Sequence, residues 1–304
     1  MRHLSLMARI AEIYLKMAYK ARTDDEIEKE LQNTDRSSPE RYTKPRSLRL
    51  SSDCTESSVN GCPVYSLRNG AGQRRTIIYL HGGAYAGEIT TFHWKAADRL
   101  AKMCDAEVVV PIYKLVPYAT YREAYDLIKE VYVQSRNQHP DRQIILMGDS
   151  AGGGLALALC EYFARKGIAQ PDRTILFSPW VDVNLENPKI REYEKRDVFL
   201  STSLRVYGRW WAGDTGTDDY RISPLFGDVE GLDHITIFVG TNEILYPDII
   251  QMYEKISASG HDHELIVGKE MSHVYPLFPI PEGKRALSYC CSIINGSVPE
   301  RRNT

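Results

Sequence analysis

Short apolar runs alternate with helix-length segments along most of this chain of 304 residues. Seven runs carry the β-branched and aromatic residues typical of strands, at residues 62–67, 74–80, 107–113, 142–148, 173–178, 234–240 and 263–268. Helix-length segments separate most of them, at residues 91–103, 120–138, 151–166 and 247–259, and another follows the last run at residues 282–294. Strands that alternate with helices predict an α/β fold, with a mostly parallel sheet covered by helices on both faces.

The first forty residues precede this alternation and have a helical pattern. An apolar stripe at helical spacing is expected from Met7, Ile10, Tyr14 and Met17. Residues 23–26, Thr-Asp-Asp-Glu, match a capping box and predict the start of a second short helix.

Residues 184–220 interrupt the alternation between two predicted strands. This insertion has a helical segment of its own at residues 203–213, and it contains an aromatic cluster of Phe199, Tyr207, Trp210 and Trp211. We expect the insertion and the N-terminal helices to form a cap over one end of the sheet.

A serine flanked by glycines lies where a strand pattern changes into a helix pattern. Gly148, Ser150 and Gly152 stand between the run at 142–148 and the helical segment at 151–166. A nucleophile on such a sharp turn needs flanking glycines, because the strand and the helix approach closely there. A turn that only packs, or one that binds phosphate, has the same pattern. The flanking strand and helix favour the catalytic interpretation, with Ser150 as the nucleophile.

The sequence His81-Gly82-Gly83 follows an earlier predicted strand. Two glycines are also typical of an ordinary turn at the end of a strand. Combined with the serine turn, however, such a loop supplies backbone N–H donors for the oxyanion of acyl transfer. Gly82, Gly83 and Ala151 are the predicted donors, and His81 is expected to shape the loop rather than to carry a proton.

A serine nucleophile of this kind needs a carboxylate and then a histidine later in the chain. Glu243 and Asp248 follow the run at 234–240, and His273 follows the run at 263–268. All three lie just beyond the carboxyl ends of predicted strands, the edge where open α/β sheets build their sites. Glu243 is the predicted acid because it lies in the loop, whereas Asp248 fits the first turn of a helix and is expected to cap it.

Composition and spacing argue against several other classes of protein. The formal net charge is −2, which gives no overall field to attract nucleic acid or an anionic membrane. No apolar run reaches the roughly 18 residues of a membrane span, and no secretory signal is apparent. Six scattered cysteines without CxxC spacing predict reduced thiols. His261 and His263 precede the last strand and are expected to face solvent. We therefore expect a cytoplasmic protein with no metal, no organic cofactor, no nucleic-acid partner and no membrane partner.

These motifs together resemble the hormone-sensitive-lipase-like group of α/β-hydrolases, also called bacterial family IV esterases. The resemblance extends from about Thr76 to Phe278 and rests on residues 81–84, 111–117, 148–153, 222–225, 243–248 and 273. It implies a single α/β-hydrolase domain over residues 1–304, an eight-stranded sheet, and a helical cap at about residues 1–40 and 184–220. It also implies hydrolysis of carboxylic esters by a serine, a histidine and an acid.

Three features depart from the pattern of that group. The acid is usually Asp, and here it is Glu243, although either carboxylate can orient an imidazole. The segment usually read as YRLAPE is YKLVPY at residues 113–118, without the acidic residue. Ala84 stands where a third glycine is common. None of these departures removes a catalytic group.

The expected substrate is a small ester with a short acyl chain. The predicted substrate-binding residues are Ala84, Tyr85, Phe199, Tyr207 and Trp211, although the two tryptophans of the insertion are equally well explained as core. An amidase or deacetylase acting on a sugar or a drug-like molecule would use the same residues. A non-catalytic small-molecule receptor is a third alternative, against which the presence of His273 counts. The resemblance also suggests a homodimer paired through the last strand.

Overall fold

The computed structural model describes residues 5–10, 22–36 and 42–297. Eight strands form one sheet in the order β1-β2-β4-β3-β5-β6-β7-β8. Pairing is antiparallel between β1 and β2 and between β2 and β4, and parallel between all other neighbours. The strands are β1 (Asp53–Val59), β2 (Cys62–Arg68), β3 (Arg75–Leu80), β4 (Ala106–Pro111), β5 (Gln143–Asp149), β6 (Arg173–Phe177), β7 (Ile235–Gly240) and β8 (His263–Gly268). The predicted α/β class with a mostly parallel sheet is confirmed.

Strand β1 was not among the seven strands predicted. Its sequence DCTESSV is polar and mostly exposed, so it lacks the apolar signal of a central strand. The turn that joins it to β2 did carry a signal in the sequence, namely the pair Asn60-Gly61. In the structure these two residues have φ angles of +49° and +76°. An Asn-Gly pair with two positive φ angles is typical of a tight hairpin. By contrast, β4 and β7 are buried along their whole length, as their unbroken apolar runs predict.

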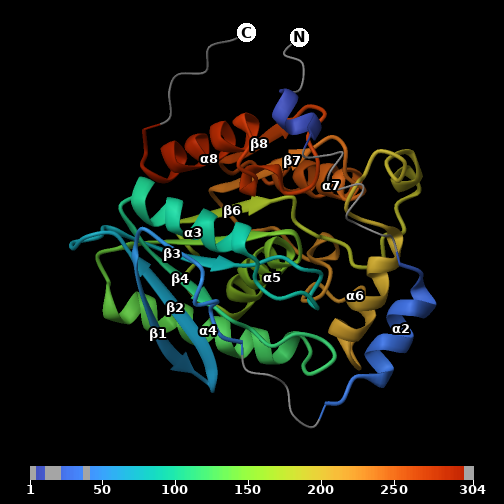
Figure 1. Cartoon of the computed structure of the whole chain (residues 1–304), viewed down its shortest axis with the longest axis horizontal. Helices are drawn as coiled ribbons and strands as arrows, with labels where there is room; N and C mark the ends of the chain where they lie inside the picture. The colour runs from blue at the N-terminus through green and yellow to red at the C-terminus, as the bar shows by residue number, and fades with distance from the viewer. Residues whose placement is uncertain (1–4, 11–21, 37–41, 298–304) are drawn as a thin grey trace.

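Helices cover both faces of the sheet (Figure 1). One face packs against α3 (Thr91–Met103) and α8 (Pro281–Ile294), and the other packs against α4 (Tyr121–Gln138), α5 (Ser150–Lys166) and α7 (Tyr246–Ser257). Each of the five helices lies within two residues of its predicted bounds. In the described part of the chain, no helix is both long and apolar enough to cross a membrane.

Two further helices lie together beside the sheet, α2 (Asp24–Asn33) and α6 (Arg205–Ala212) (Figure 1). Asp24 forms an ion pair with Arg205 at 2.8 Å, and the indole N–H of Trp210 donates to Glu28 at 3.2 Å. The capping box predicted for residues 23–26 is present at the start of α2. Helix α2 from the N-terminal part of the chain and helix α6 from the insertion are therefore in contact.

The apolar stripe expected near the N-terminus is not buried where the structure describes it. Residues 6–10 are helical, but Met7 is 54% exposed and Ile10 is 57% exposed, whereas Ala8 is buried. Tyr14 and Met17 lie outside the described residues. Helical spacing was therefore a correct guide to the helix but not to the face that packs.

Candidate active site

Ser150 lies at the sharp junction of β5 and α5, in the backbone conformation expected for an exposed nucleophile. Its φ angle is +52°, which is strained for a residue with a side chain. The two flanking glycines allow this turn. A Cβ atom on Gly152 would lie 2.2 Å from the carbonyl oxygen of Leu80, and one on Gly148 would lie 2.3 Å from that of Gly152. Strand order also favours a site here, because β3 and β5 are neighbours whose connections run to opposite sides of the sheet.

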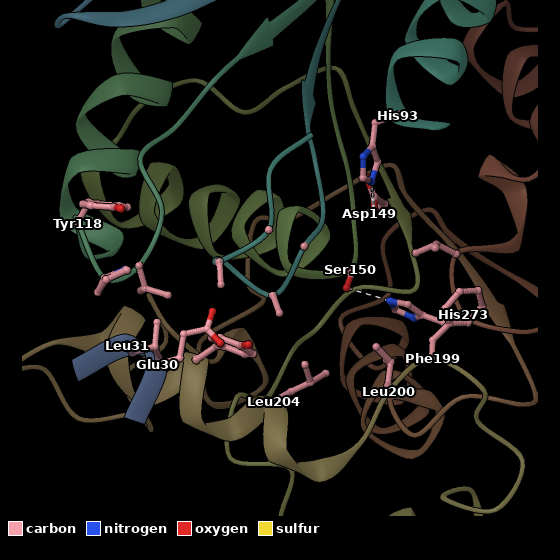
Figure 2. A pocket seen from close by; sticks show the side chains of 18 of the residues that line it. Glu30, Leu31, His93, Tyr118, Asp149, Ser150, Phe199, Leu200, Leu204 and His273 are labelled. Atoms are coloured by element: carbon pink, nitrogen blue, oxygen red, sulfur yellow. Dashed lines mark hydrogen bonds and ion pairs between the residues drawn. The ribbon is translucent and has the colours of Figure 1, made fainter. Parts of the chain in front are cut away.

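His273 connects Ser150 to Glu243. Its Nε2 atom lies 2.9 Å from Ser150 Oγ (Figure 2). Its Nδ1 atom lies 2.5 Å from Glu243 Oε2. A carboxylate can only accept, so the ring carries its hydrogen on Nδ1, and Nε2 is left to accept a proton from the serine. Asp248, the rival acid, lies in the first turn of α7, where burial raises the pKa of its carboxyl to about 7.

Two donors that the sequence did not reveal hold Glu243 in place. Its Oε1 atom accepts hydrogen bonds from Ser178 Oγ and from the Gly240 N–H, both at 2.8 Å. Ser178 Oγ in turn accepts from the Val274 N–H at 3.1 Å, next to His273. The serine lies directly after β6 with a φ angle of +47°. Only its position at the end of a strand could have pointed to it.

The charges around His273 favour its protonated form. Burial by itself lowers the pKa of His273, but the carboxylates of Glu243, Asp197 and Asp149 outweigh burial and raise the pKa above its usual value. A raised pKa means that the imidazole becomes a stronger base, and that it is neutral only at higher pH. Any reaction in which it takes a proton from Ser150 must therefore slow as the pH falls through that pKa.

The predicted oxyanion donors come from two elements, the loop after β3 (Gly82 and Gly83) and the first turn of α5 (Ala151). The Gly82 N–H donates to Asp149 Oδ1 at 3.1 Å, so the prediction that it binds an oxyanion is corrected. Among the described residues, the N–H groups of Gly83 and Ala151 have no hydrogen-bond acceptor. Gly83 needs to be glycine, because its φ angle is +125° and a Cβ atom would lie 2.4 Å from the Gly87 carbonyl oxygen.

The buried carboxylate of Asp149 holds the loop after β3 in place through hydrogen bonds. In addition to Gly82 it accepts from the Tyr79 hydroxyl at 2.6 Å, and its Oδ2 atom lies 3.2 Å from His93 Nε2. The Thr90 N–H donates to His93 Nδ1 at 2.9 Å, so the hydrogen of this ring is on Nε2 and points to Asp149. Burial alone would raise the pKa of Asp149, but His93 and the other donors lower it below its usual value.

His81 is neutral and shapes the loop, as expected. Its Nδ1 atom lies 2.7 Å from the Gly82 carbonyl oxygen, and its ring stacks on Tyr113 with centroids 4.6 Å apart. Complete burial lowers the pKa of His81 to about 4. At neutral pH the ring is therefore uncharged, and its Nδ1–H donates to the Gly82 carbonyl oxygen.

A cavity of about 520 Å³ opens beside Ser150. Of the predicted substrate-binding residues, Ala84, Phe199 and Tyr207 line it. Tyr85 and Trp211 do not line it, and this is a correction: their rings stack 4.3 Å apart in the core beneath the loop. Most of the remaining wall is apolar, with polar side chains at a few points. It consists of Glu30, Leu31, Thr34, Gly83, Ala86, Gly87, His93, Val116, Pro117, Tyr118, Asp149, Leu200, Leu204, His273 and Val274 (Figure 2).

No metal site is apparent in the ranges 5–10, 22–36 and 42–297, where no three His, Cys, Asp or Glu side chains are placed to share an ion. The rings of His261 and His263 lie 6.2 Å apart in an edge-to-face arrangement. His261 faces solvent as expected, but His263 is half-buried, and burial lowers its pKa.

Comparisons with known proteins identify the family and the fold of this chain. The model of a family described as having the α/β-hydrolase fold matches residues 77–277. An esterase of Acinetobacter venetianus is 32% identical over 224 residues, which cover 72% of this chain and 74% of the relative. An acetyl-hydrolase of Streptomyces hygroscopicus is 28% identical over 248 residues, which cover 80% of this chain and 83% of that protein.

Solved structures share the same architecture. A proposed esterase of Staphylococcus aureus is 25% identical and superposes with a TM-score of 0.84, over 92% of this chain and 95% of that one. A hormone-sensitive lipase from a metagenome library is 24% identical, with a TM-score of 0.80 over 96% of this chain and 99% of that one. The second likeness concerns the fold alone.

Proposed function

This chain belongs to the α/β-hydrolase family, and we propose that it is a serine carboxylesterase that hydrolyses small esters with Ser150, His273 and Glu243. The family confirms the resemblance noted in the sequence. Ester hydrolysis is supported by relatives named esterase and acetyl-hydrolase. The observation that carries the proposal is the continuous hydrogen-bonded series from Ser150 Oγ through His273 to the buried carboxylate of Glu243.

In the first half of the reaction, Ser150 Oγ attacks the carbonyl carbon of the ester. His273 Nε2 takes the serine proton as the new C–O bond forms, and Glu243 stabilises the imidazolium that results. The carbonyl oxygen becomes an oxyanion, which the N–H groups of Gly83 and Ala151 bind. Ala151 lies in the first turn of α5, where the helix dipole also favours negative charge.

The tetrahedral intermediate then breaks down, and the alcohol leaves with the proton from His273 Nε2. Water attacks the acyl-enzyme in the second half, and its proton passes to the same nitrogen. Collapse of the second intermediate releases the carboxylic acid and returns the proton to Ser150 Oγ. Each step uses only the side chains and N–H groups that surround Ser150.

The cavity supports small, uncharged substrates. Its volume of about 520 Å³ lies within the range of pockets for small molecules, and most of its wall near Ser150 is apolar. Leu200, Leu204 and Val274 would surround a short acyl or alcohol chain there. No lysine or arginine side chain lines the cavity, so an anionic substrate would find no partner charge in its described wall.

Turnover of p-nitrophenyl acetate, butyrate and octanoate tests the proposal. The purified protein should hydrolyse the two shorter esters faster than the octanoate, and Ser150→Ala should abolish turnover without changing the melting temperature. A fluorophosphonate should attach its phosphonyl group to Ser150 Oγ, with loss of fluoride, in the parent only. Equal activity of the parent and Ser150→Ala would overturn the assignment. A matched anilide would show whether amides are also cleaved.

A further inference from the structure

The carboxylate of Asp197 bonds to two separate segments of the active site. This residue lies in the insertion, between the short helices η1 (Pro188–Glu192) and η2 (Thr202–Leu204). Its Oδ1 atom accepts from the N–H groups of Phe199 at 2.8 Å and Leu200 at 2.9 Å. Its Oδ2 atom accepts from the N–H of Ile244, also at 2.8 Å. All three bonds are made to backbone, so they constrain the path of the chain itself.

The two segments joined by Asp197 have different tasks. Ile244 directly follows Glu243, so its N–H belongs to the loop that carries the acid. Phe199 and Leu200 form the cavity wall next to His273 (Figure 2). Phe199 also stacks on Phe278, with ring centroids 5.6 Å apart and planes at 4°. The wall that would contact substrate is therefore tied to the acid loop through one side chain.

We propose that Asp197 is a positioning residue for the reaction, which holds the Glu243 loop and the Phe199–Leu200 wall in one arrangement around His273. This inference rests on the proposed esterase function. It adds a group from the cap to a site whose other members come from the ends of the central strands. Asp197 belongs to none of the sequence motifs, so only the folded structure brings it to attention.

Electrostatics supports the same role. Three carboxylates act electrostatically on His273: Glu243 from the loop after β7, Asp197 from the insertion, and Asp149 from the end of β5. Burial lowers the pKa of His273, and each of the three carboxylates opposes that effect. The interaction between Asp197 and His273 also acts on Asp197. Burial raises the pKa of the Asp197 carboxyl, and the nearby His273 partly opposes that effect. Asp197 therefore favours the imidazolium that forms while Ser150 attacks the ester.

The test compares pH profiles of kcat/KM for p-nitrophenyl butyrate between pH 5 and 9. Asp197→Asn removes the charge and keeps the size of the side chain, so the acid limb should move to lower pH by about 0.5–1 unit. The plateau should fall about tenfold, since one backbone N–H of the acid loop or the wall loses its charged acceptor. Asp197→Glu keeps the charge, and its acid limb should stay near that of the parent.

A matched control comes from the segment between β6 and the insertion. Asp182 accepts the N–H of Asn184 at 2.9 Å, a local turn like that of Asp197, but it makes no described bond to the acid loop. Asp182→Asn should leave the acid limb unchanged. If Asp197→Asn does not fold, Asp197→Ser provides the same test, because serine is uncharged and supports a similar local turn.

An acid limb that is the same in the parent and in the uncharged variants would overturn the role of Asp197. If the acid limb is unchanged and Asp197→Asn and Asp197→Glu lose the same amount of activity, Asp197 has only a structural role. Failure of the esterase proposal is a separate outcome, seen as a parent protein that neither turns over esters nor labels at Ser150.

Discussion

Replacing Glu243 with glutamine removes the charge of the proposed acid while keeping its shape. The Nδ1–Oε2 distance of 2.5 Å places the centres of the two charges about 4 Å apart. At an effective dielectric constant of about 20, that separation corresponds to about 4 kcal/mol of stabilisation for the imidazolium. A loss of this size corresponds to about a 10³-fold fall in kcat. The amide also disturbs the tautomer of His273, which can bring the fall to about 10⁴-fold.

The pH dependence of the same variant has a definite sign. Glu243 raises the pKa of His273, so Glu243→Gln should lower that pKa and move the acid limb of kcat/KM to lower pH. The assay is the initial rate with p-nitrophenyl butyrate from pH 5 to 9, with the melting temperature as a check on folding. Asp248→Asn is the matched control, because this rival carboxylate makes no described bond to His273, and its activity should equal that of the parent. A Glu243→Gln variant that is folded and fully active would refute the assignment of the acid.

Three further outcomes concern stability. Gly152→Ala would place a Cβ atom 2.2 Å from a backbone oxygen, so it should lower the free energy of unfolding by about 3 kcal/mol or more. Gly216→Ala is the control, because nothing lies within 4 Å of the added Cβ atom, and it should leave the melting temperature unchanged. Burial raises the pKa of Asp248 to about 7, so its stabilising contribution is full at low pH and is lost as the pH rises through 7. In denaturant titrations, Asp248→Asn should therefore be more stable than the parent at pH 8 and no more stable at pH 4. Glu107 forms two ion pairs with arginines, each at 2.6 Å, which overcome the effect of burial and lower the pKa of its carboxyl. Glu107→Gln should therefore lower the free energy of unfolding by about 3 kcal/mol at neutral pH, and the difference from the parent should shrink as the pH falls below about 4.

The sequence alone determined the order of the elements and pointed to the three residues of the proposed triad. Apolar runs of strand length and helices of 3.6-residue periodicity are local patterns, so seven strands and five helices could be predicted close to their observed bounds. The glycines around Ser150 carried information for a similar reason, because a close approach of strand and helix excludes a side chain wherever it occurs. Ser150 and His273 followed from their positions at strand ends, and Glu243 from its place in a loop.

The tertiary structure decided everything that depends on which backbone and side-chain groups meet. Gly82 could not be recognised as a partner of Asp149, nor Asp197 as a partner of Ile244, because each bond joins segments that are distant in the chain. Tyr85 and Trp211 have the composition of a pocket wall, but their rings stack in the core. A hydrogen bond or a stacked pair forms only when its groups lie within a few ångströms of each other, and only the packing of the sheet and the segments around it sets such distances.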